Sequence, residues 1–163
     1  MATGLFQILS PKRAKLSDTI TKELRSGDLP HYGEIEISRL KARVDRFVDA
    51  FVESTTGEPL AFVRFIERLA EERIAEGYYL EEIQRVLNLL WQHSWKAVVD
   101  HAPAESRLEE LEVISRTVGD AKDELARIYL ARTLEVNTRA QELEQRLKQL
   151  MGDRVPRLSD DDQ

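Results

Sequence analysis

Apolar residues recur at every third or fourth position along most of this chain, which is the spacing that gathers side chains on one face of an α-helix. Prolines, glycines and short polar runs interrupt the pattern and mark where helices begin and end. No stretch alternates between apolar and polar residues as a β-strand does, and no segment repeats. The pattern therefore predicts an all-α fold, with helices at residues 11–25, 35–54, 58–75, 80–102 and from 104 onward, and a connector at 29–33.

The predicted helix at 80–102 is apolar around most of its circumference, and only a narrow polar arc remains. A helix of this kind is normally enclosed by other helices, so we expect it to be the central helix of the core. Trp91 and Trp95 lie four residues apart on it, and Phe62 and Phe65 lie on the helix before it. These rings are candidates for the wall of a small apolar ligand pocket, although core packing is the simpler explanation.

Histidine is the residue type in this helix that could bind a cofactor. His93 lies at the edge of the apolar arc and is a candidate axial ligand of a haem. We favour the interpretation that His93 lies at the boundary of the core and is hydrogen-bonded to a neighbouring group. No cofactor is then expected, and haem binding is the alternative. His101 follows eight residues later, which misses the spacing of four that lets two side chains on one helix face hold a metal ion. No metal site is predicted.

The last predicted helix carries two apolar rows in different registers. From Leu111 to Ile128 the apolar positions advance by alternating steps of three and four, as in a helix that packs lengthwise on others. The phase then shifts by one residue and a second row follows, flanked by Arg139 and Glu144, which would pair between the chains of a parallel dimer. We therefore expect a homodimer through a linker helix at 122–150, while packing of this helix onto its own core stays an open alternative. The second row consists of Val136, Ala140, Leu143, Leu147 and Leu150.

Composition limits the classes of partner. A chain of 163 residues is large enough for one self-sufficient domain, which we divide into an N-terminal extension at 1–9, a helical sensor-like domain at 10–150 and a disordered acidic tail at 151–163. The formal net charge of −6 argues against nucleic acid as a partner, and the basic segment at 11–15 is interpreted as a solvated first turn. No apolar run approaches the ~20 residues that span a bilayer, and a cytoplasmic location is expected.

Catalytic motifs are absent from the sequence. Neighbouring acids such as Glu81 and Glu82 point in different directions on a helix, so they do not form a general acid–base pair. No histidine follows a glutamate by three residues, and there is no glycine-rich phosphate loop or nucleophile elbow. With three histidines and no cysteine, the chain is predicted not to be an enzyme.

The order of the last two helices resembles that of a known family. The segment AEGYYLEEIQRVLNLLWQHSW at 75–95, a break at Pro103 and the segment VGDAKDELARIYL at 118–130 are similar to the N-terminal domain of RsbR-type stressosome proteins, which are RsbT co-antagonists. The likeness covers roughly residues 12–150. It implies a globin-like helical bundle without haem that dimerises, feeds a long C-terminal helix into an output domain and acts on a regulatory protein partner.

Three functions therefore remain under consideration. The leading one is a non-catalytic regulatory or sensory domain that relays a ligand- or partner-dependent signal through a dimer and its C-terminal helix. The alternatives are a haem-binding globin-type sensor with His93 as axial ligand, and a helical adaptor that binds a larger protein through its surface. An enzyme with a scattered site ranks below them, because no residue in the sequence nominates a substrate.

Overall fold

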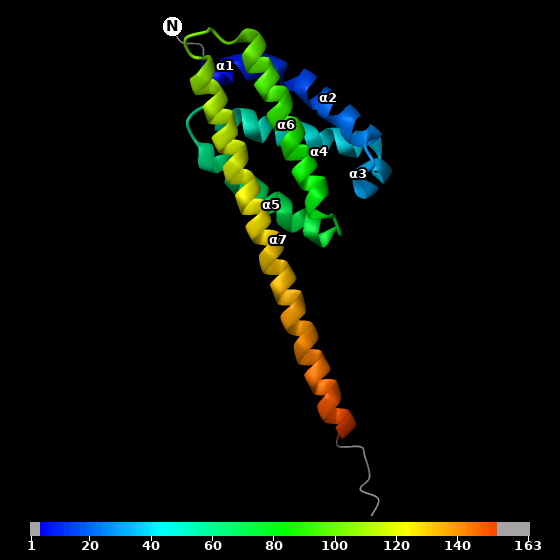
Figure 1. Cartoon of the computed structure of the whole chain (residues 1–163). Coiled ribbons are helices and arrows are strands. Elements are labelled where there is room, and N and C mark those ends of the chain that lie inside the picture. Colours follow the sequence, from blue (N-terminus) through cyan, green and yellow to red (C-terminus); the bar gives the residue numbers. More distant parts are fainter. Residues whose placement is uncertain (1–3, 153–163) are drawn as a thin grey trace, which may run out of the picture. The chain divides into compact units, whose positions relative to one another are not determined.

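Helices make up nearly the whole of the computed structural model, which describes residues 4–152 (Figure 1). No strand occurs within this range, so the predicted all-α class is confirmed, as is the long C-terminal helix. The chain divides into two units, Met1–Tyr129 and Leu130–Gln163, which we call the helical body and the C-terminal segment. The elements are α1 (Leu5–Leu9), the 3₁₀ helix η1 (Ser10–Lys12), α2 (Arg13–Ser26), α3 (Pro30–Glu34), α4 (Ile37–Ser54), α5 (Pro59–Ala75), α6 (Leu80–His101) and α7 (Arg107–Gly152).

Two short helices were not anticipated from the periodicity. The predicted connector contains α3, which begins at Pro30, a position where the missing backbone N–H of proline is not needed. Residues 4–9 of the expected N-terminal extension contain α1, and Leu5, Ile8 and Leu9 are buried in the core. Helices of five residues span little more than one turn, so they are too short to show a repeating pattern. From residue 153 onward, the predicted acidic tail lies outside the described residues.

The core of the helical body forms around α6, as its all-round apolar sequence predicts. This helix packs against α1 and α2, while α2 packs against α4 and α4 against α5. In Figure 1 the green α6 lies among these helices. The buried apolar residues of α6 point to several sides of the helix rather than to one: they are Ile83, Val86, Leu87, Leu89, Leu90, Ala97 and Val98.

The first apolar row of α7 completes this core. Each of its members from residue 114 onward is at most 8% exposed, so the steps of three and four do mark a face that packs within the chain. The buried members of the row are Ile114, Val118, Ala121, Leu125 and Ile128.

Within residues 4–152, no helix combines the length and the apolar composition that crossing a membrane requires.

A tight turn separates α5 from α6 and fixes the start of α6. Gly77 has φ of +85°, a conformation that residues with a side chain rarely adopt. The turn lets the backbone N–H of Tyr78 donate to the carbonyl of Arg73 (2.9 Å), which closes the end of α5. Tyr78 and Tyr79 follow directly, so this glycine places two aromatic residues at the junction of the two helices.

Candidate functional site

A buried carboxylate joins α3 to the start of α6. Glu82 is 1% exposed, and its carboxylate accepts hydrogen bonds from the backbone N–H groups of His31 (2.8 Å) and Tyr79 (3.0 Å). It also lies 2.7 Å from Nδ1 of the His31 ring. Burial alone would raise the pKa of Glu82, but these hydrogen bonds and the imidazole outweigh it and hold the pKa below its usual range.

The ring of Tyr78 connects this carboxylate to two arginines. It stacks on His31 with 4.5 Å between ring centroids, and the guanidinium carbons of Arg73 and Arg43 lie 5.5 and 5.9 Å from the Tyr78 centroid. Such cation–π contacts stabilise an arginine that is withdrawn from water, and Arg73 is only 2% exposed. Arg43 also donates to the Tyr78 hydroxyl (2.9 Å).

Glu76 forms ion pairs with both arginines. It accepts from Arg73 (2.9 Å) and from Arg43 (2.7 Å). Burial acts to raise the pKa of Glu76, but the two guanidinium groups outweigh it and lower the pKa. The resulting group draws on α3, α4, α5 and α6, and we call it the Tyr78 cluster: His31, Arg43, Arg73, Glu76, Tyr78 and Glu82.

Tyr129 links the Tyr78 cluster to α7. Its hydroxyl donates to the backbone carbonyl of Tyr78 (2.8 Å). Tyr129 is the last residue of the helical body, and α7 continues from it into the C-terminal segment without a break. The cluster is therefore tied to the helix that the sequence analysis assigned to signal output.

The phenols of Tyr129 and Tyr32 should lose their protons at a higher pH than an ordinary tyrosine does. Burial, followed by the charges of Glu82 and Glu81, raises the pKa of Tyr129 to about 12, and burial also raises the pKa of Tyr32. Because both values are raised, their contribution to stability is complete below about pH 10, the usual tyrosine pKa, and is lost as the pH rises through the folded value. Ultraviolet difference titration of the folded protein should show this late phase.

A Tyr129→Phe variant serves as the control for that titration. It should remove one late-titrating group and so reduce the amplitude of the late phase. It should also lower the free energy of unfolding at neutral pH by about 1 kcal/mol, because the Tyr78 carbonyl loses its donor. A late phase of unchanged amplitude in this variant would contradict the assignment.

The four aromatic residues proposed as a pocket wall fall into two separate ring clusters. Phe62 and Phe65 stack with 6.1 Å between centroids, and Phe62 also contacts Phe51 at 5.3 Å. Trp91 and Trp95 contact one another at 5.0 Å, and Trp91 is 37% exposed, with its indole N–H donating to the Ser115 hydroxyl (3.4 Å). Among the residues that the structure describes, no ring contact joins the phenylalanines to the tryptophans.

The histidines of α6 both have hydrogen-bond partners. His93, the candidate haem ligand, is half-buried, and its Nε2 lies 2.6 Å from a carboxylate oxygen of Glu23 on α2. His101 Nδ1 lies 2.9 Å from the carbonyl of Ala97. Between residues 4 and 152, no group of three or more histidine, cysteine or acidic side chains is placed to hold a metal ion.

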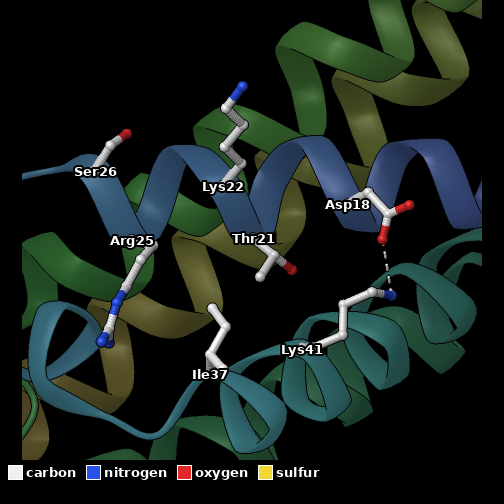
Figure 2. Close-up of a pocket in the computed structure, with 7 residues that line it drawn as sticks. All are labelled: Asp18, Thr21, Lys22, Arg25, Ser26, Ile37 and Lys41. Atoms are coloured by element: carbon white, nitrogen blue, oxygen red, sulfur yellow. Dashed lines mark ion pairs between the residues drawn. The ribbon is translucent and has the colours of Figure 1, made fainter.

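Two surface cavities flank α2. The one between α2 and α4 encloses about 410 Å³ (Figure 2). Lys41 pairs there with Asp18 (3.3 Å) and with Asp45, and Arg25 donates to the Ile35 carbonyl (2.6 Å). In Figure 2 the side chain of Thr21 points into the gap between the helices, and its buried hydroxyl has no partner among the described residues.

The second cavity encloses about 300 Å³ between α2 and the last turns of α6. Basic side chains dominate its lining: Lys12 and Lys15 come from the segment at 11–15, and Lys96 comes from α6. The sequence alone predicts a solvated first turn for that segment. The sequence does not show that the segment at 11–15 lies near the histidines of α6, because the two segments are about eighty positions apart along the chain.

The second apolar row of α7 is exposed in the C-terminal segment. Val136, Leu143, Leu147 and Leu150 are between 59 and 65% exposed, and Ala140 is exposed as well. The two residues expected to pair across a dimer each have an acidic or basic partner within this chain. Arg139 pairs with Glu135 (2.8 Å) and Glu144 with Lys148 (2.7 Å), both one helical turn away.

The comparisons with known proteins agree with the resemblance noted in the sequence. Residues 14–144 match the family model described as the RsbT co-antagonist protein rsbRD N-terminal domain. Neither the curated proteins nor the solved structures contain a match. The match covers most of the helical body and extends into the second apolar row of α7. The chain therefore belongs to the family of RsbT co-antagonist rsbRD N-terminal domains.

Proposed function

We propose that this chain is a non-catalytic, cytoplasmic regulatory domain that relays a ligand- or partner-dependent signal through a homodimer and its C-terminal helix. The observation that carries the proposal is the exposed second apolar row of α7. Its five apolar residues follow one another in steps of three and four, and the four large ones are each more than half exposed, which matches the seam of a coiled coil. Exposed apolar rows of this regularity mark interaction surfaces.

The Tyr78 cluster supplies a route by which the helical body acts on that row. It ties four helices and the α5–α6 turn to Tyr129. A ligand or partner that favours one arrangement of these helices would shift Tyr129, and α7 would carry the shift as a rotation or translation of the whole helix. Membership in a regulatory family with protein partners supports this role.

Disulfide trapping tests the dimer directly, because the chain has no cysteine of its own. In a parallel coiled coil, the two copies of residue 143 face each other across the seam, within the Cα separation of roughly 4.4–6.8 Å that a disulfide requires. Leu143→Cys should therefore form a covalent dimer rapidly under mild oxidation. Non-reducing electrophoresis measures the yield.

The matched control is Gln145→Cys, two residues further on the opposite face of the same turn. It should cross-link at least tenfold more slowly, because its sulfur atoms would be separated by the width of two helices. Equal rates at both positions would indicate random collisions and argue against the seam. A chain that sediments as a monomer at every concentration tested would refute the homodimer outright.

A further inference from the structure

We propose that the groove between the start of α2 and the end of α6 binds a small phosphate monoester. The groove encloses about 300 Å³, at the lower end of the roughly 300–1,000 Å³ typical of small-molecule sites. Three ammonium groups and two imidazoles line it: Lys12, Lys15, Lys96, His93 and His101. No other cavity described above combines so many cationic or N–H-bearing groups. All of these residues belong to the helical body, and the proposal does not rest on the proposed dimer.

The three lysines of this groove have no ion-pair partner between residues 4 and 152. Lys41 in the neighbouring cavity, by contrast, pairs with Asp18 (Figure 2) and also with Asp45. Asp100 is the one acidic residue among the described residues that line the groove. The groove thus holds an excess of positive charge on a chain whose formal net charge is −6. An anion is the ligand that this local excess favours.

Each of the two histidines is oriented by a contact to one of its ring nitrogens. A carboxylate oxygen of Glu23 lies 2.6 Å from Nε2 of His93, and the carbonyl oxygen of Ala97 lies 2.9 Å from Nδ1 of His101. Each contact engages one nitrogen, so the second nitrogen of each ring remains available to a ligand. Fixing one ring nitrogen in this way is how proteins set the orientation and tautomer of the other.

The number of donors distinguishes phosphate from a simple carboxylate. A carboxylate is satisfied by one or two cationic donors, whereas a phosphate monoester carries up to two charges on three acceptor oxygens. Leu16 and Ala97 form the apolar part of the lining, which an organic group attached to the phosphate would contact. The carboxylate of Asp100 can accept from a hydroxyl on that group, which favours a hydroxylated ester over inorganic phosphate.

Calorimetric titration with glycerol 1-phosphate at constant ionic strength tests the proposal. We expect saturable binding at one site per chain. The ring proton signals of His93 and His101 should shift in NMR spectra, while those of His31, in the Tyr78 cluster, should not. Lys15→Gln/Lys96→Gln should weaken binding at least tenfold. The control pair Lys22→Gln/Lys122→Gln removes two lysines that also lack ion pairs among the described residues, and it should leave the affinity within twofold of the parent.

Three results would overturn the proposal. Binding that falls equally in both double variants would show diffuse charge attraction and not a site. No saturation with glycerol 1-phosphate would exclude the ligand class. Binding only to vesicles that contain phosphatidic acid would place the phosphate recognition at a lipid surface instead of in the groove. Circular dichroism of each variant confirms that the fold is retained, and the exposed positions of Lys15 and Lys96 make a folding defect unexpected.

Discussion

Replacing Glu82 with alanine is expected to lower the free energy of unfolding by about 3–5 kcal/mol. The change deprives the backbone N–H groups of His31 and Tyr79 of their acceptor inside the protein, and each buried donor left unsatisfied costs about 1–3 kcal/mol. It also removes the partner of the His31 ring. For a domain of this size the midpoint of thermal unfolding should fall by roughly 10 °C. Chemical denaturation followed by circular dichroism measures the change.

Glu81→Ala is the matched control for this prediction. Glu81 is the preceding residue on the same first turn of α6, but it is exposed and does not take part in the hydrogen bonds of the Tyr78 cluster. Its replacement should change the free energy of unfolding by less than about 0.5 kcal/mol. If both variants lost the same stability, the effect would come from the helix N-terminus and not from the buried carboxylate.

The acid limb of the stability curve gives a second readout of Glu82. Because its pKa is lowered by folding, the carboxylate contributes stability that is complete above its unfolded value of about 4.5 and is lost as the pH falls through the folded value. Glu82→Ala should therefore flatten the decline of stability below about pH 4.5. The decline should not vanish, because the pKa values of Glu76 and Asp45 are lowered too.

The positions of the long helices follow from local patterns in the sequence. Pro59 and Gly77 bound α5, and the 3–4 steps that begin at Leu111 mark the face of α7 that is buried. These features depend on residues close together in the chain, which is why periodicity and breakers locate them. The short helices α1 and α3 depend instead on packing against distant helices, and their five residues carry no repeat.

The polar clusters depend on pairs that no local pattern links. His31 and Glu82 are separated by fifty-one positions, and His93 and Glu23 by seventy. The sequence predicts Glu81 and Glu82 as two adjacent acids on an exposed helical surface. In the structure Glu81 is exposed, but Glu82 is buried. A signal was present in the segment itself: Glu82 lies three residues after Tyr79, where a glutamate can cap the start of a helix. That local signal identifies Glu82 as the cap of α6, but it does not identify His31, which contacts the same carboxylate.

Replacing Leu143 with glutamate is expected to raise the dissociation constant of the dimer by roughly 100- to 10,000-fold. Each protomer would contribute one Leu143 to the seam, and burying one leucine side chain is worth about 1.5–3 kcal/mol. Two copies therefore supply about 3–6 kcal/mol, and each 1.4 kcal/mol corresponds to a factor of ten in the dissociation constant. The two carboxylates would also repel one another across the seam. Sedimentation velocity over a range of concentrations measures the change.

Gln145→Glu adds the same charge to the outer face of the same turn and should leave the dissociation constant within about threefold of the parent. Loss of the dimer should also reduce the helix signal, because a segment of two heptads is not stable as an isolated helix in water. The helical body should keep its cooperative unfolding, since its buried row ends at Ile128. If Leu143→Glu left the dissociation constant unchanged, the exposed row of α7 would not be the dimer seam, and signal output through this helix would need another binding surface.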